Sequence, residues 1–327
     1  MNKLLETIEK FNGAHLLVVG DLMLDRFVMG DVERLSPEAP VPVLRVVSEE
    51  RRLGGAANVA HNIRTLGGRV TACGVIGDDD PGQRILGFLR RVGASTAGVF
   101  TDRKFQTIQK SRIIASPHHQ QIVRLDRESR EPIHAATLRR LREFILDRAE
   151  RCDGVVISDY GKGAVHAELL SALAARAGKR KILCVVDPKK ENFPRYRFPT
   201  LITPNKSEAA DAAGIDIHDD KTLLAAGAKL LRQWRAQGVL ITRGADGMSL
   251  FRPRCKPRHF PTEPRDVFEV TGAGDTVVAV CALVLACGGD FAAAAVIANV
   301  AAGFVGDEIG TVAVTFSKLK SRIEELS

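Results

Sequence analysis

The sequence predicts an α/β fold in which helices cover both faces of a mostly parallel sheet. Short β-rich runs alternate with helical patterns along nearly the whole chain, and this alternation is typical of parallel sheets. Hydrophobic residues make up 45% of the 327 residues and charged residues 26%, close to the globular average. Because the chain has no internal repeat, low-complexity tract or long linker, we expect a single domain spanning residues 1–327.

The expected strands of the main sheet are short and apolar, and they span residues 16–20, 70–76, 154–158, 182–187, 201–203 and 238–242. Helical patterns are found at residues 135–151, 167–177 and 222–237, and a charged amphipathic helix is expected at the N-terminus. Two very apolar helical runs, 277–287 and 291–305, follow late in the chain, and helices that are apolar all round are buried ones. Ligands of such folds bind at the carboxyl ends of the strands.

Two stretches interrupt the alternation of strands and helices. Residues 31–47 and 105–125 contain strand patterns without an intervening helix, so we expect a small antiparallel sheet apart from the main one. Such a sheet would project over the ligand-binding edge as a lid. The pattern alone leaves a simple extension of the main sheet open as an alternative.

Composition and charge disfavour several classes of protein. The formal net charge is +8, but no block of five or more Lys or Arg occurs and aromatic residues make up only 5%, so we expect no nucleic-acid partner. The six cysteines form no C-x-x-C pair, and neither a zinc site nor a disulfide framework is expected. Apolar runs stay below about 18 residues and no secretory apolar segment follows the first basic residue. We therefore expect a cytoplasmic enzyme without a membrane partner.

A glycine-rich turn before the first late apolar helix is the sharpest local motif. Gly272, Ala273 and Gly274 are followed by Asp275 and then by the helix. Glycines let backbone N–H groups approach an anion closely, and a helix N-terminus carries a partial positive charge. A carboxylate beside a bound phosphate fits a general base that activates a hydroxyl for phosphoryl transfer. An ordinary helix N-cap is the competing interpretation of Asp275.

Other nucleotide and hydrolase motifs are missing from the sequence. It contains no G-x-x-x-x-G-K-[ST] phosphate loop and no G-x-S-x-G nucleophile elbow. The G-x-G-x-x-G dinucleotide motif fails because Val277 stands where the third glycine would fall. P-loop ATPases, serine hydrolases and dehydrogenases are therefore disfavoured.

Two further motifs indicate a site for sugar hydroxyls. Gly54 and Gly55 precede a predicted helix that carries Asn58, and exposed backbone near an amide side chain suits vicinal hydroxyls. Close packing of helix on sheet explains the same glycines without a ligand. Asp21 and Asp25 follow the first buried strand, where carboxylates suit hydroxyl binding, although a loop-capping aspartate has the same pattern.

Together, the early Gly54-Gly55-x-x-Asn58 and the late Gly272-Ala273-Gly274-Asp275 resemble the paired signatures of ribokinase-like (pfkB) carbohydrate kinases. The resemblance covers essentially the whole chain and implies a ribokinase-like sandwich with a small β lid. Two separated motifs in the right order are far more specific than either alone.

Within this family, further segments are similar to kinases that phosphorylate O1 of D-glycero-D-manno-heptose 7-phosphate in ADP-heptose synthesis for lipopolysaccharide. These segments are GDLMLDR (20–26), LSPEAPVPV (35–43), SDYGKG (158–163), VDPK (186–189), TPNKSE (203–208) and TRGADGMSL (242–250). Many such relatives carry a fused nucleotidyltransferase with an H-x-G-H motif, which this sequence lacks, so the chain resembles the stand-alone kinase. Another sugar kinase of the family is the first alternative, and a non-catalytic sugar- or nucleotide-binding protein is the second.

The resemblance assigns roles to individual residues. Asp275 would deprotonate the acceptor hydroxyl, while amides of the glycine turn, beginning at Thr271, would stabilise charge on the phosphoryl group. The residues assigned to sugar hydroxyls are Asp21, Asp25, Gly54, Gly55 and Asn58. Those assigned to ATP are Asn205, Ser207, Glu208, Thr242, Gly244, Gly247, Thr271, Asn299 and Gly303. Of these, Asn205 and Glu208 would also position Mg²⁺.

A phosphorylated sugar also requires cations in the site. Alternation places Lys110 and Arg112 on one face of a predicted lid strand, and the other candidate cations are Arg124, Lys162 and Lys189. Arginine offers bidentate phosphate geometry and lysine a point charge. Each cation alone is typical of a solvated surface, but we expect the group to contain the phosphate clamp.

Two features bear on potassium and on assembly. Glu269 stands where relatives usually have Asp, and the segment 306–308 is unusually acidic, both in regions where the family often builds a monovalent-cation site. The resemblance therefore leaves K⁺ activation open. Ribokinase-like enzymes often dimerise through their lids, and Val41, Val43 and Val46 would give this lid an apolar face, so we expect a homodimer.

Overall fold

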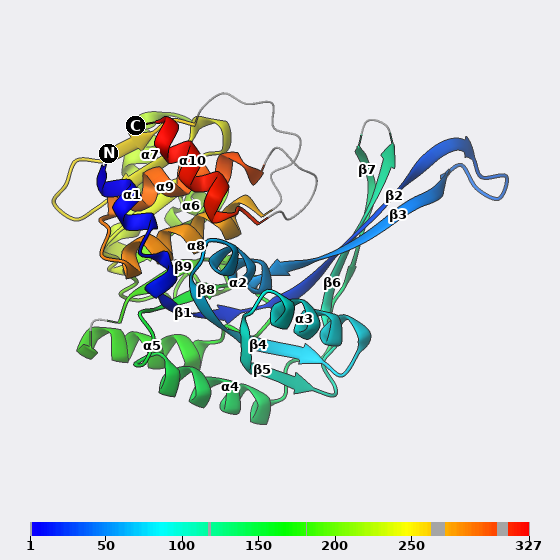
Figure 1. The fold of residues 1–327 in the computed structure, drawn as a ribbon, viewed down its shortest axis with the longest axis horizontal. Coiled ribbons are helices and arrows are strands. Elements are labelled where there is room, and N and C mark those ends of the chain that lie inside the picture. Colours follow the sequence, from blue (N-terminus) through cyan, green and yellow to red (C-terminus); the bar gives the residue numbers. More distant parts are fainter. Residues whose placement is uncertain (1, 117–118, 181, 263–271, 306–312, 327) are drawn as a thin grey trace.

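The structure is a computed structural model that describes residues 2–116, 119–180, 182–262, 272–305 and 313–326. A helix-covered body carries a small sheet that projects from one side (Figure 1). The predicted α/β class, with a large mostly parallel sheet and a second small sheet, is confirmed.

In the main sheet the order of the strands reverses at β1: β4 and β5 lie on one side of it, and β8 and the later strands lie on the other. In the described ranges its strand order is β13-β12-β11-β10-β9-β8-β1-β4-β5. The strands are β1 (His15–Gly20), β4 (Arg69–Gly77), β5 (Ser95–Asp102), β8 (Gly154–Ser158), β9 (Cys184–Asp187), β10 (Leu201–Ile202), β11 (Val239–Thr242), β12 (Met248–Phe251) and β13 (Arg258–Phe260). Neighbouring strands from β5 to β11 pair in parallel, and β12 pairs antiparallel with both β11 and β13. A ligand is therefore expected beyond the carboxyl ends of β1 and β8.

Helices cover both faces of this sheet because successive strand residues point to opposite faces. In β1, Leu16 and Val18 enter one apolar core, and Leu17 and Val19 enter the other. The first core is covered by α1 (Asn2–Ile8), α2 (Ala56–Thr65), α3 (Asp80–Arg91), α8 (Ala273–Ala286), α9 (Phe291–Gly303) and α10 (Phe316–Glu325). The second is covered by α4 (Ala135–Arg148), α5 (Ala167–Arg180), α6 (Lys206–Ala213) and α7 (Asp220–Trp234).

The small sheet has the order β3-β2-β6-β7. Its strands are β2 (Leu22–Leu35), β3 (Pro42–Gly55), β6 (Ile108–Ser116) and β7 (Gln120–Arg127). They extend beyond the expected 31–47 and 105–125, because β2 begins just after β1 and β3 returns as far as Gly55. The sheet is mixed rather than antiparallel as expected: β2 and β6 both leave the body in the same direction and pair in parallel (Figure 1).

Most element ends differ from the predicted ends by a few residues. The helix expected to end at residue 151 ends at Arg148, and the one expected from 222 begins at Asp220, where Asp219 forms a capping box with Thr222. The two apolar helices lie against each other in the core as α8 and α9, separated at Gly288 and Gly289.

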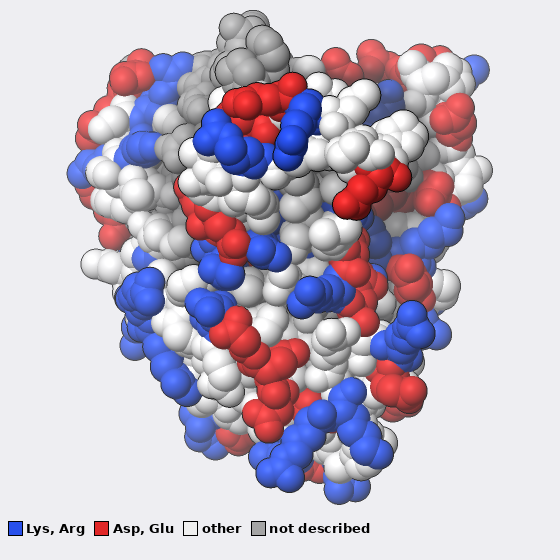
Figure 2. All heavy atoms as spheres, turned by 90° about the vertical axis from the view of Figure 1, so that its right-hand side faces the viewer, with Lys and Arg blue, Asp and Glu red and all other residues white. Residues whose placement is uncertain are grey.

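The surface carries mixed charge on the face that bears the small sheet. Lys and Arg side chains alternate there with Asp and Glu side chains (Figure 2). None of the helices in the described ranges is both long and apolar enough to cross a membrane.

Candidate active site

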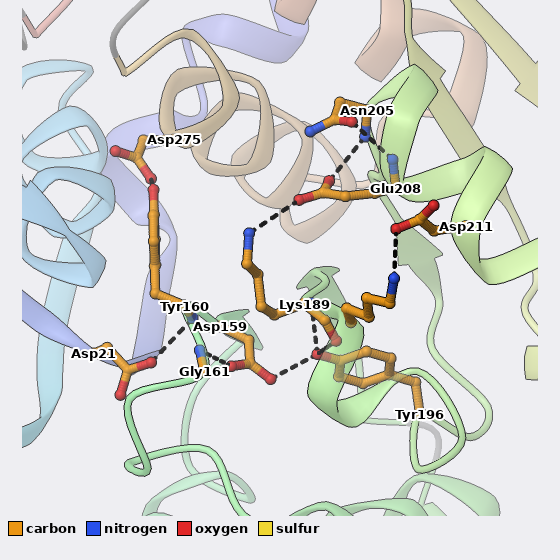
Figure 3. Close-up of polar contacts among 11 residues, drawn as sticks. Asp21, Asp159, Tyr160, Gly161, Lys189, Tyr196, Asn205, Glu208, Asp211 and Asp275 are labelled. Atoms are coloured by element: carbon orange, nitrogen blue, oxygen red, sulfur yellow. Dashed lines mark hydrogen bonds and ion pairs between the residues drawn. The ribbon is translucent and has the colours of Figure 1, made fainter.

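The functional residues converge at the carboxyl edge of the main sheet. Asp21 follows β1, Tyr160 follows β8, Asp187 ends β9, and Asn205 follows β10 at the start of α6. The N-terminus of α8 lies above the same edge and brings Asp275 to it (Figure 3). Residues from five separate segments thus meet where the fold predicts a ligand.

Asp275 does not cap α8. Gly272 is the N-cap residue, with no side-chain hydrogen bond at the cap, and Asp275 lies in the first helical turn. Its buried carboxylate accepts hydrogen bonds from Asn58 Nδ2 at 2.8 Å and from Tyr160 Oη at 2.9 Å. The capping interpretation is therefore wrong, and a carboxylate held from two sides fits the general-base interpretation.

Burial raises the pKa of Asp275 to about 7. The hydrogen bonds from Asn58 and Tyr160 lower this pKa, the charge of Asp25 raises it and the charge of Lys110 lowers it, but desolvation is the largest effect. A carboxylate with a pKa near neutrality is suited to take a proton from a hydroxyl and later to release it.

The turn before α8 leaves backbone amides facing the site. Gly272 adopts φ +89°, a left-handed conformation that favours glycine, and this turns the chain into the helix. The helix begins with Ala273, and Gly274 is exposed, so the first amides of α8 are available to an anion beside Asp275.

Asp25 forms a buried ion pair next to the glycines of the early motif. It lies on β2 and accepts a hydrogen bond from Arg112 Nη1 of β6 at 2.9 Å, with only 4% of Asp25 and 8% of Arg112 exposed. A Cβ on Gly54 would lie 2.6 Å from Asp25 Oδ2, so the close approach of this carboxylate requires glycine there. Gly55, at φ +56°, is the N-cap residue of α2 and brings Asn58 toward Asp275.

Asp21 supports the loop that carries Tyr160. Its carboxylate accepts hydrogen bonds from the backbone N–H groups of Tyr160, Lys162 and Ala164 at 2.9, 3.0 and 3.1 Å. Burial and the charge of Asp159 raise the pKa of Asp21 to about 6. These hydrogen bonds hold the loop after β8 in place, as the loop-capping interpretation of Asp21 predicts.

The Asn205 and Glu208 pair closes the N-terminus of α6. Asn205 Oδ1 accepts from the Glu208 N–H at 2.9 Å, and Glu208 Oε2 accepts from the Asn205 N–H at 3.1 Å, which is a capping box. Glu208 Oε1 also lies 3.7 Å from Lys189 Nζ (Figure 3). Lys189 thus lies beside Glu208 rather than with the cations of the small sheet.

The carboxyl groups of Asp187 and Glu208 concentrate negative charge near the N-terminus of α8. Burial and the charges of Glu208 and Asp275 raise the pKa of Asp187 well above its usual range, and burial also raises the pKa of Glu208. A divalent cation would relieve this repulsion. In the described ranges no group of three His, Cys, Asp or Glu side chains could hold a metal ion on its own.

A cavity of about 230 Å³ lies beside two of the residues assigned to ATP. Asn299 and Gly303 of α9 line it, together with Pro261 and Thr262 after β13 and Arg322 of α10. Asn299 Nδ2 donates to Pro261 O at 2.8 Å and fixes one wall of the cavity.

The remaining residues assigned to ATP lie on the loops beside α6. Thr242 ends β11 and bridges to Asn205, and Ser207 is exposed in the first turn of α6. Gly244 is exposed in the short 3₁₀ turn after β11, whereas Gly247 is buried against the backbone of Phe260. Thr271, Glu269 and the segment 306–308 lie outside the described residues.

The predicted phosphate-binding cations are not equivalent. Arg112 is paired with Asp25, Arg124 with Asp126 on the exposed face of β7, and Lys162 Nζ with Glu128 at 2.5 Å. Lys110 is half-buried, and its ammonium lies 5.3 Å from the centre of the Tyr160 ring. Among the described residues it makes no ion pair, so Lys110 is the candidate cation best placed to meet an incoming anion.

Three residues of the site were not predicted from the sequence: Tyr160, Asn62 and Asp187, which ends β9. Tyr160 donates to Asp275, and Asn62 Nδ2 donates to Asn58 O at 3.0 Å and to Asn58 Oδ1 at 3.3 Å, which orients the Asn58 amide. Tyr160 directly follows a strand at the ligand edge, and that position is the signal that singles it out. Asn62 lies one helical turn after Asn58, a spacing also typical of a buried core polar group.

The site and fold together define an α/β enzyme that transfers phosphoryl groups to a hydroxyl. Residues 14–316 match the family described as pfkB family carbohydrate kinase. The chain belongs to this family and is a sugar kinase.

Solved structures show the same fold. Phosphofructokinase-2 from Escherichia coli superposes with a TM-score of 0.77 at 20% identity, covering 96% of this chain and 98% of that one. A ribokinase from Arabidopsis thaliana, complexed with ribose and ATP, superposes with a TM-score of 0.73 at 19% identity, covering 94% of this chain and 98% of that one.

Curated relatives are more similar in sequence but longer. Bifunctional protein HldE from Geobacter metallireducens is 48% identical over 299 residues, which cover 91% of this chain and 61% of the relative. Bifunctional protein HldE from Pelobacter propionicus is 46% identical over 310 residues, covering 94% and 63%. The chain thus spans less than two thirds of the length of these relatives.

Proposed function

We propose that this kinase uses ATP to phosphorylate O1 of D-glycero-D-manno-heptose 7-phosphate. The observation that carries the proposed chemistry is the Asp275 carboxylate, held by Asn58 and Tyr160 beside the open amides of α8. The segments that resemble heptose 7-phosphate kinases and the 46–48% identity to proteins named HldE support the choice of sugar. Lipopolysaccharide synthesis is the corresponding pathway.

Asp275 acts as the general base in the proposed mechanism. Its carboxylate removes the proton of the acceptor hydroxyl as that oxygen attacks the γ-phosphorus of ATP, and ADP leaves. The first amides of α8, including those of Ala273 and Gly274, donate to the negative charge that develops on the transferred group. Asn58 keeps one carboxylate oxygen oriented, and Asp25, next to Gly54, is placed to accept hydrogen bonds from sugar hydroxyls.

The residues present fit both ATP and Mg²⁺. The cavity between α9, α10 and β13 would hold the adenine. The sequence assigns Mg²⁺ to Asn205 and Glu208. Because Asn205 Oδ1 already accepts from the Glu208 N–H, Glu208 and the neighbouring Asp187 would hold the ion through its waters. When bound, Mg²⁺ neutralises phosphate charge. Lys189, next to Glu208, would contribute a further positive charge on the nucleotide side.

The proposed substrate is tested by ADP release from Mg-ATP with a panel of acceptors. We expect turnover with heptose 7-phosphate and none above the no-sugar blank with ribose, fructose or fructose 6-phosphate. The Asp275→Asn protein, prepared identically, controls for contaminating kinases, and ³¹P NMR of the product locates the new phosphate. Repeating the assay with K⁺ in place of Na⁺ tests potassium activation.

Each result of this assay has a distinct meaning. Turnover with another sugar alone would keep the catalytic assignment of Asp275 and overturn the heptose assignment. Tight ATP binding without turnover on any sugar would favour the binding-protein alternative.

We also propose that two copies associate through the small sheet. Its strands and the turn before β3 expose large apolar side chains, namely Val32, Leu35, Val41, Val46, Val47, Ile122, Val123 and Leu125. The small sheet is long and twisted and extends away from the body (Figure 1). A second copy of the same sheet would cover these side chains, because exposed apolar surface of this extent is typical of an interface.

We expect light scattering to give the mass of a dimer at micromolar concentration and of a monomer for Val47→Lys or Leu125→Lys. A charged side chain in the interface would have to be desolvated, which weakens association. Leu224→Lys, on an exposed part of α7, is the matched control and should leave the dimer intact. A wild-type monomer would contradict this mode of assembly.

A further inference from the structure

Tyr160 connects three parts of the site. Its hydroxyl donates to Asp275 Oδ1 at 2.9 Å and its backbone N–H donates to Asp21 at 2.9 Å (Figure 3). The centre of its ring lies 5.3 Å from the Lys110 ammonium. Asp275 is on α8, Asp21 follows β1, and Lys110 is on β6 of the small sheet. A single, partly buried side chain therefore lies between the base and the small sheet.

The two hydrogen bonds to Asp275 leave its carboxylate little rotational freedom. Asn58 donates to Oδ2 and Tyr160 to Oδ1, so each oxygen is fixed by one donor and retains lone-pair capacity for the acceptor hydroxyl. Tyr160 is fixed in turn, because Asp21 also binds the backbone N–H groups of Lys162 and Ala164 in the same loop.

We propose that Tyr160 is a positioning residue for the base: its hydroxyl orients the Asp275 carboxylate from the side opposite Asn58, and its ring holds the Lys110 ammonium over the sugar site. This inference rests on the proposed role of Asp275 and deepens it. The ring of tyrosine attracts a cation through its electron-rich face, and the hydroxyl is at the same time a donor to a carboxylate. Phenylalanine keeps the first property and loses the second.

The charged groups around Asp275 give the direction of the expected effect. In the described part of the chain, Asp25 on β2 and Asp187 on β9 disfavour the ionised carboxylate, and Lys110 on β6 favours it. The hydrogen bond from Tyr160 also favours the ionised form and lowers the pKa of Asp275. Removing this donor should therefore raise that pKa, so that the base ionises at higher pH.

The direct test uses the fact that the chain has only two tyrosines. Tyr196→Phe leaves Tyr160 as the sole tyrosine, and its near-ultraviolet absorbance then reports whether its partner carboxyl is ionised. We expect a pH-dependent change with a midpoint near 7, the pKa of Asp275, and its loss when Asp275→Asn is added. The same signal in both proteins, or none between about pH 5 and pH 9, would overturn the inference. No sugar is used, so a wrong heptose assignment does not affect this result.

The kinetic test uses Tyr160→Phe with whichever acceptor supports turnover. We expect the acidic limb of kcat/KM to move to higher pH by roughly one unit or more, with kcat restored at high pH and the KM for ATP unchanged. Tyr196→Phe is the matched control, because Tyr196 is the other tyrosine that donates to an aspartate, at 2.6 Å from Asp159 Oδ2. Its acidic limb should stay in place. A uniform loss of kcat at all pH values in Tyr160→Phe would indicate a merely structural role.

Discussion

Replacing Asp275 by asparagine is expected to lower kcat by about 10²- to 10⁴-fold, the range that a positioned general base contributes. Asparagine is nearly isosteric with aspartate but cannot accept the proton of the acceptor hydroxyl. The cavity proposed to hold the adenine lies between α9, α10 and β13 and is not lined by residue 275, so ATP binding measured by calorimetry should be retained.

The matched control for this variant is Asp290→Asn. Asp290 caps α9 by accepting from the Ala293 N–H at 2.8 Å, and asparagine caps helices equally well, so activity and stability should stay close to wild type. Near-normal turnover of Asp275→Asn would remove Asp275 from the role of base.

The raised pKa of Asp275 predicts how activity and stability depend on pH. In the proposed mechanism the base must be ionised, so kcat/KM should fall as the pH drops below about 7. Between the usual value of 3.8 and about 7, the folded protein holds a proton that the unfolded chain has released. The contribution of this group to the free energy of unfolding therefore decreases as the pH rises through this window. Thermal unfolding at pH 8 should show Asp275→Asn to be no less stable than wild type, because the ionised Asp275 carboxylate is buried in the folded protein and this burial lowers the free energy of unfolding.

The sequence predicts the main body well because its signals are local. Strand–helix alternation, the apolar runs that became α8 and α9, and the glycine turn at Gly272 each depend on residues close together in the chain. The parallel pairing of β2 with β6 is different, since alternation of apolar residues shows that a strand exists but not which strand lies beside it. The sequence places Asp25 only after the first buried strand, and the structure places it on β2.

The sequence also did not predict which polar and charged side chains contact each other in the folded protein. Arg112 has the pattern of a phosphate ligand, but its buried neighbour Asp25 is 87 residues away and pairs with it. Asn58 and Asp275 were predicted separately, and the direct hydrogen bond between them, across 217 residues, was not. The Asn205-x-x-Glu208 capping box, by contrast, is visible in the sequence as a helix N-terminal signature.

The buried pair of Asp25 and Arg112 gives the largest expected effect on stability. Arg112→Met would leave the Asp25 carboxylate buried without its counter-ion, which costs about 3 to 5 kcal/mol in comparable pairs. The Arg112 guanidinium also lies 5.3 Å from the centre of the Phe27 ring, and methionine can replace part of that packing but not the charge. Urea unfolding should therefore show a clear loss of the free energy of unfolding.

Arg124→Met is the matched control on the neighbouring strand. Arg124 pairs with Asp126, but half of the Arg124 side chain is exposed, and exposed pairs contribute about 0 to 1 kcal/mol. A loss of similar size in both variants would contradict the assignment of Arg112 as a buried structural partner. If Arg112 instead binds the substrate phosphate directly, Arg112→Met would raise the KM for the sugar phosphate while leaving unfolding nearly unchanged.

The double variant Asp25→Leu with Arg112→Met separates the fold from the chemistry. Apolar side chains in place of a buried ion pair often restore stability, so this protein should unfold at higher urea concentration than Arg112→Met alone. It should still fail to phosphorylate a sugar, because leucine offers no acceptor for the hydroxyls beside Gly54. Recovery of activity along with stability would show that the pair serves only to join β2 to β6, and that sugar hydroxyls are bound elsewhere.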